Sequence, residues 1–119
     1  MLRGVLTVEP SVKVYLLDKN QQRFFGDGPC RLLRLVEETG SLRSAASAMG
    51  MAYSKAIHLL SHAEQALGYP LTTRVIGGKS GGGSQLTLQG KELLEQYEIY
   101  RQLCEQSSRD IFRQVFGEG

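Results

Sequence analysis

Polar and cationic side chains gather near the start of a helix that the sequence predicts over residues 52–67. Tyr53, Ser54, Lys55 and His58 fall off the apolar stripe of that helix, so we expect them to face solvent. Hydroxyl, ammonium and imidazole groups in this position can bond to base edges when a helix lies in the major groove of duplex DNA. The alternative interpretation is an ordinary helix with a solvated polar face.

A glycine-rich stretch over residues 77–84 carries one cation, Lys79, beside Ser80. Gly78, Lys79 and Ser80 have the order that ends a phosphate-binding loop, but Thr73 stands where that motif needs its first glycine. No helix is predicted directly after the stretch, which argues against nucleotide hydrolysis. The stretch joins two predicted strands, 71–76 and 85–88. It is therefore typical of a wing whose lysine contacts phosphate or the minor groove, or else of a flexible solvated hairpin.

The elements that would position these groups follow from the apolar spacing. A strand over 12–17 and a return over 22–25 predict an N-terminal β-hairpin, and a first helix is expected from Pro29 to Gly40. Ser41 is a good N-cap for a short second helix, and Gly50 separates that helix from the third. Small alanines let the second and third helices cross closely, which predicts a helix-turn-helix.

A long helix is predicted over residues 88–116, with neither glycine nor proline after Gly90. Its apolar stripe is longer than a small core can cover, so we expect it to pair with a second copy of the chain in a homodimer. The predicted dimerisation residues are Leu93, Tyr97, Tyr100, Cys104, Ile111 and Val115.

Several classes of function are disfavoured by composition. Paired carboxylates, a nucleophile with its base and a metal-ligand cluster are not evident, so we expect neither an enzyme nor a metal site. Cys30 and Cys104 have no metal or redox spacing and are expected to be reduced, packed thiols. The sequence shows no apolar run of membrane-spanning length and no signal peptide, so a cytoplasmic protein without membrane contact is expected.

These features predict a single, mainly α domain over residues 1–119 with a small β component. It comprises the β-hairpin (12–25), a winged helix-turn-helix (29–87) and the dimerisation helix (88–116). Residues 41–87 hold four basic residues and one acidic residue, a net charge of +3 within a chain of net charge +2. Arg74 either contacts phosphate or pairs with a carboxylate. The residues expected to contact double-stranded DNA are Ser41, Arg43, Ser44, Tyr53, Ser54, Lys55, His58, Arg74, Lys79 and Ser80.

Three segments resemble the DNA-binding domain of the ModE family of molybdate-responsive transcriptional regulators: residues 40–46, 50–56 and 74–87. The glycine-rich run followed by a Leu-Thr strand is the most specific of them. A more distant likeness to the LysR-type DNA-binding domain runs through the same helix-turn-helix. The sequence departs from the ModE pattern at Ile57 and His58, where that family usually has tryptophan and an acidic residue, so a different target sequence is expected.

The resemblance implies a homodimer that binds DNA through its third helix and wing. It also implies control of molybdenum uptake or molybdenum-enzyme genes. Full-length members sense molybdate through further C-terminal domains, so we expect no cofactor in this chain. Sensing, if any, would then occur in another domain or in a separate molybdate-binding protein. The alternative is a LysR-like or ModE-like interaction module that acts through a partner protein without sensing molybdate directly.

Overall fold

The computed structural model of the chain describes residues 8–76 and 83–117. Four helices and two small antiparallel hairpins confirm the predicted mainly α winged helix with a long C-terminal helix. The elements follow one another in the order β1 (Leu16–Leu17), β2 (Arg23–Phe25), α1 (Asp27–Thr39), α2 (Leu42–Ala48), α3 (Tyr53–Leu67), β3 (Thr72–Val75), β4 (Gly83–Leu86) and α4 (Leu88–Phe116).

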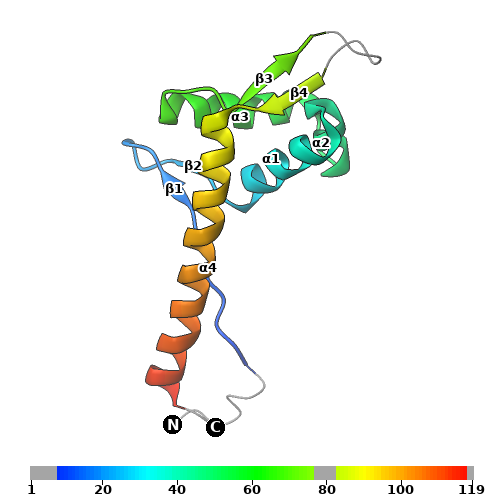
Figure 1. The fold of residues 1–119 in the computed structure, drawn as a ribbon. Helices are drawn as coiled ribbons and strands as arrows, with labels where there is room; N and C mark the ends of the chain where they lie inside the picture. The colour runs from blue at the N-terminus through cyan, green and yellow to red at the C-terminus, as the bar shows by residue number, and fades with distance from the viewer. Residues whose placement is uncertain (1–7, 77–82, 118–119) are drawn as a thin grey trace.

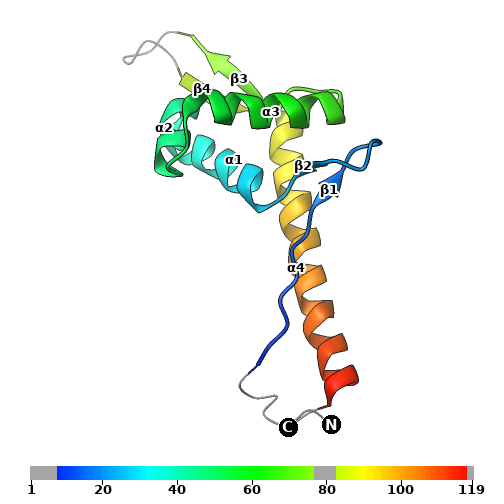
Figure 2. The ribbon, with the colours of Figure 1, turned by 180° about the vertical axis from the view of Figure 1, so that it is seen from behind.

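The molecule is elongated because α4 extends well beyond the other elements (Figures 1 and 2). Its extents are 61 × 31 × 23 Å and its radius of gyration is 18.0 Å, whereas a compact chain of this length would have a radius of about 14 Å. We call residues 16–76 and 83–97 the head and residues 98–116 of α4 the stalk. The extended segment before β1 runs beside the stalk in both views.

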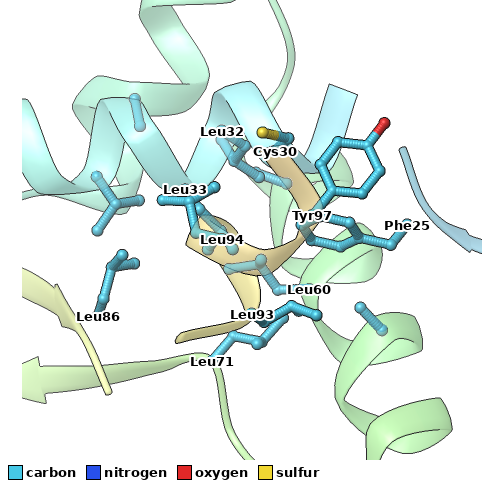
Figure 3. Packing of buried hydrophobic residues seen from close by; sticks show 14 of the residues in the cluster. Phe25, Cys30, Leu32, Leu33, Leu60, Leu71, Leu86, Leu93, Leu94 and Tyr97 are labelled. Carbon is cyan, nitrogen blue, oxygen red and sulfur yellow. The ribbon is translucent and has the colours of Figure 1, made fainter. Parts of the chain in front are cut away.

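The core of the head is built where α1 and α3 meet the beginning of α4 (Figure 3). Leu33, Leu71 and Leu94 are at most 1% exposed, and the rings of Phe25 and Tyr97 meet edge to face with centroids 5.1 Å apart. The burial of these side chains from segments distant in sequence fixes α4 against the helix-turn-helix.

The helix-turn-helix forms as its small residues predict. Ala45 and Ala46 of α2 and Ala56 of α3 are almost fully buried, so the two helices approach closely. The Ser41 hydroxyl accepts a 3.0 Å hydrogen bond from the Ser44 N–H, which confirms the predicted cap. Gly40 follows α1 with a φ of 71°, a left-handed conformation that favours glycine.

Two predicted boundaries at the N-terminal side are wrong. The ladder of the first hairpin contains only Leu16 and Leu17 on one side, rather than residues 12–17, and it is interrupted by an irregularity in the register. Upstream, the carbonyl of Val14 accepts a hydrogen bond from the Tyr97 hydroxyl at 2.8 Å. This carbonyl is therefore paired with a side chain of α4 instead of with a neighbouring strand. Helix α1 begins at Asp27, two residues before Pro29, because the N–H groups of the first turn need no helical partner.

The boundaries of the second hairpin also differ from those predicted. Its second strand, β4, runs from Gly83 to Leu86, and Leu88 already belongs to α4. Thr87 follows the strand and caps the helix: its hydroxyl accepts a hydrogen bond from the Gly90 N–H at 2.9 Å and donates one to the Pro70 carbonyl at 2.7 Å. The start of α4 is therefore tied to the chain entering β3.

Candidate nucleic-acid interface

The β3–β4 hairpin is attached directly to the turn between α1 and α2. The Ser84 N–H donates a 2.9 Å hydrogen bond to the Gly40 carbonyl. At the neighbouring Gly83, any Cβ would collide with that same oxygen, so only glycine allows this approach. The wing is thus held in a fixed position beside the first residues of the helix-turn-helix.

This attachment creates an open cleft of about 790 Å³ between α2, the start of α3 and the hairpin. The structure therefore brings together half of the residues predicted to contact DNA, although they come from three separate segments. The predicted residues that line the cleft are Ser41, Arg43, Ser44, Tyr53 and Arg74.

Two of these residues form a stacked pair across the helix-turn-helix. The Arg43 guanidinium carbon lies 4.0 Å from the centre of the Tyr53 ring, which is cation–π geometry. The stack joins the exposed side of α2 to the first residue of α3. Because stacking leaves the edge of a guanidinium open, Arg43 retains donors for a phosphate or a base.

The exposed side of α3 carries the other predicted base-reading residues. Ser54, Lys55 and His58 are all exposed, whereas Ala56 and Leu60 are buried against the core. The three polar residues are not part of the cleft lining and lie on the adjoining turns of the helix. Their contact with DNA stays a prediction.

Arg74 was open to two interpretations, a phosphate contact or an ion pair. Its side chain is exposed, and within the described residues no carboxylate lies at ion-pair distance from it. A phosphate contact by Arg74 stays a prediction. Lys79 and Ser80 lie outside the described residues.

The far end of α3 is held by the N-terminal hairpin. The Nε2 atom of His62 lies 3.7 Å from Asp18 Oδ2. The N–H groups of Gln22 and Asn20 donate to the Asp18 carboxylate, and these bonds, the Gln22 bond most of all, lower the pKa of Asp18. His62 thus faces the hairpin, one turn beyond the exposed His58.

The predicted dimerisation stripe divides into two parts, and its assignment was wrong for Leu93 and Tyr97. Both side chains are buried within the core of the protomer (Figure 3) and cannot face a second copy. Burial raises the pKa of Tyr97 to about 12. The other four predicted residues, Tyr100, Cys104, Ile111 and Val115, line an open apolar groove along the stalk together with Pro10 and Val12.

Charged side chains secure α4 where it leaves the head. The Arg34 guanidinium donates to both carboxylate oxygens of Glu98, which lowers the pKa of that carboxyl. The Cys30 thiol lies 3.8 Å from Glu98 Oε2. Burial, reinforced by this carboxylate, raises the pKa of Cys30, so the thiol is a packed group rather than a reactive one.

Sequence reasoning did not anticipate two features of this surface. Ile57 is 44% exposed on α3, among the polar residues; its place one turn after Tyr53 was the available signal. The approach of Gly83 to Gly40 could not be predicted, because nothing in the glycine-rich stretch distinguishes Gly83 from the other glycines.

Comparison with known proteins identifies the family. The family described as "Bacterial regulatory helix-turn-helix protein, lysR family" matches residues 30–91, which run from α1 through the hairpin into α4. The chain belongs to this lysR family. The residues that line the cleft all fall within the matched segment.

Similarity extends to individual regulators. The chain is 36% identical over 104 residues to the molybdenum transport protein ModE of Herbaspirillum seropedicae, covering 87% of this chain and 36% of that protein. It is 33% identical over 101 residues to the DNA-binding transcriptional dual regulator ModE of Escherichia coli (strain K12), covering 83% and 38%. The molybdenum-pterin-binding protein MopB of Rhodobacter capsulatus is 36% identical over 66 residues, covering 56% and 24%. The chain thus spans little more than a third of the length of the two ModE proteins.

Within residues 8–76 and 83–117, no helix combines the length and apolarity that crossing a membrane requires. In the same ranges, no three His, Cys, Asp or Glu side chains are grouped as a metal ion would need.

Proposed function

We propose that this lysR-family protein is a transcriptional regulator that binds duplex DNA with α3 in the major groove and the β3–β4 wing on the adjacent backbone. The observation that carries this proposal is the common cleft formed by the helix-turn-helix and the wing. A hydrogen bond from the Ser84 N–H to the Gly40 carbonyl holds the wing against the helix-turn-helix. Both parts would therefore contact DNA in a fixed relative geometry.

The chemistry of the surface supports the division of contacts. Arg43 and Arg74 are exposed cations on either side of the cleft and suit phosphate oxygens. Ser54, Lys55 and His58 extend from the first turns of α3, the part of a recognition helix that meets base edges. Phosphate contacts would supply affinity and the α3 contacts would supply sequence preference.

Dimerisation is the second part of the proposal, with a second copy of this chain as the occupant of the stalk groove. Tyr100, Ile111 and Val115 are 53%, 56% and 69% exposed, although they continue the apolar stripe that is buried in the head. A two-fold symmetric pairing of two stalks would cover both stripes at once and set two α3 helices on one duplex.

The genes proposed as targets are those of molybdenum uptake or molybdenum enzymes. Support comes from the names of the relatives, which include molybdenum transport proteins and a molybdenum-pterin-binding protein. The family match is confined to the segment that contains the helix-turn-helix. We therefore assign any molybdate response to another domain or to a separate molybdate-binding protein.

The proposal is tested by selection of bound duplexes from a random pool and, in parallel, from sheared DNA of the source genome. A DNA-reading protein should enrich one motif, with an affinity that falls as salt rises. The genomic fragments should lie upstream of molybdenum genes. Enrichment of no motif would contradict DNA readout, whereas a clear motif located elsewhere in the genome would contradict only the molybdenum assignment.

A further inference from the structure

An exposed aliphatic side chain interrupts the polar surface of α3. Ile57 is 44% exposed, and on this helix, all of which lies in the described part of the chain, it is the single large apolar residue that is exposed. The remaining apolar pattern of α3 is directed inward, with Ala56, Leu60 and Ala63 buried. Ile57 therefore has no core to pack on along its outer side.

The position of Ile57 places it on the side of α3 that would enter the groove. Ser54 precedes it by three residues and Ser61 follows by four, so all three lie along one side of the helix. Tyr53, four residues before it, lines the cleft. Ile57 thus lies on the same side as Ser54, one of the residues proposed to reach base edges, about one turn into the helix.

The chemistry of base edges limits what Ile57 can meet there. In the major groove the edges of all four base pairs present hydrogen-bonding groups, and the one apolar group is the C5-methyl of thymine. A lone isoleucine among serine, lysine and histidine side chains is also much smaller than the apolar patch on which a protein partner docks. Both considerations favour a base methyl over a protein surface.

We propose that Ile57 is a specificity-determining residue that packs on the C5-methyl group of a thymine in the target duplex. This inference rests on the proposed DNA-binding function and adds a base identity to it. The exposed Ile76 at the base of the wing lies outside α3 and is not part of the proposal.

The test replaces each thymine of the selected duplex, one at a time, with uracil, which lacks only the methyl group. For the wild-type chain, uracil at one thymine per half-site should weaken binding about fourfold, the equivalent of one lost methyl contact. Ile57→Ala should bind the thymine duplex about fourfold more weakly for each half-site contacted and should no longer distinguish uracil from thymine at that position. Ile57→Val, which keeps a branched aliphatic side chain, should retain the discrimination.

Controls separate this inference from the proposed function. Alanine favours helix more than isoleucine does, so Ile57→Ala should keep the wild-type fold. Leu17→Ala removes a similarly exposed apolar side chain from β1 and should leave the uracil effect unchanged. Equal sensitivity to uracil in the wild type and Ile57→Ala, or no sensitivity at any thymine, would overturn the Ile57 assignment alone. Failure of the wild type to select any sequence would overturn the DNA-binding function and this inference with it.

Discussion

Leu94 and Leu103 belong to the same helix, α4, yet their surroundings are opposite. Leu94 is 1% exposed within the head, and Leu103 is 62% exposed on the stalk. The apolar spacing is continuous across the two regions, so the spacing indicates which side of the helix needs cover but not what covers it. In the head the cover is α1, α3 and the residues leading into β3; for the stalk we propose a second copy of the chain.

Matched truncations of these two leucines give the largest expected difference. Leu94→Ala should lower the free energy of unfolding by about 2–5 kcal/mol, because it leaves a cavity in a packed core. Leu103→Ala should change it by no more than about 0.5 kcal/mol at protein concentrations where the chain is monomeric. Urea unfolding over a concentration series measures both. A large loss for Leu103→Ala that does not depend on concentration would show that the stalk is stabilised within one chain.

A charge on the stalk should separate dimer formation from folding. Ile111→Glu would place an unpaired carboxylate in the proposed seam and should raise the dimer dissociation constant at least about 100-fold. Gln102→Glu adds the same charge outside the groove lining and should leave the dimer intact. Sedimentation equilibrium distinguishes them. A wild-type protein that is monomeric at micromolar concentration would contradict the pairing of stalks.

Within the head, a single added methyl group at Gly83 should weaken the attachment of the wing to Gly40. Gly83→Ala forces a methyl group against the Gly40 carbonyl and should displace β4. We expect the affinity for the selected duplex to fall about tenfold, the effect of a 1–3 kcal/mol overpacking strain. Ser84→Ala is the control, because its backbone N–H still reaches Gly40. Unchanged affinity in titrations of Gly83→Ala would mean that the wing position does not matter for binding.

The smallest expected effect on stability is at Tyr97, near the boundary between head and stalk, and it depends on pH. Tyr97→Phe removes the hydroxyl that donates to the Val14 carbonyl and should cost about 1 kcal/mol of stability at neutral pH. Because the pKa of Tyr97 is raised to about 12 from its usual value of 10, its stabilising effect is complete below pH 10 and is lost as the pH rises toward 12. Denaturant unfolding of both proteins between pH 9 and 12 should therefore show the wild type losing stability more steeply than Tyr97→Phe. Parallel pH curves would contradict the assignment.

The sequence was sufficient for the helices whose ends are marked locally. Gly40 and Gly68 adopt left-handed conformations where α1 and α3 end, and Ser41 caps α2 as its side chain predicts. It was insufficient where a distant group decides the outcome. The strand expected over residues 12–17 is shortened because the hydroxyl of Tyr97, far along the chain, donates a hydrogen bond to the Val14 carbonyl.

The candidate site shows the same division. Tyr53 was expected to face solvent from its spacing, but it is half-buried against the core, and its stacking on the exposed Arg43 depends on the angle between α2 and α3. Leu93 and Tyr97 have the same periodicity as Tyr100 and Ile111, and only the packed structure shows that the first pair is internal. Spacing defines faces of helices, whereas the partners of those faces are set by tertiary packing.

The central claim, that α3 reads DNA sequence, is tested most directly by one ratio. The affinity for the selected duplex is divided by the affinity for random duplex, for the wild type and for the triple variant Ser54→Ala, Lys55→Ala and His58→Ala. Each side chain that reads a base should contribute about 1–3 kcal/mol to the selected duplex and far less to random sequence, so the ratio should fall at least about tenfold. An unchanged ratio in a folded triple variant would show that α3 is not the reader, and the proposed mechanism would be wrong.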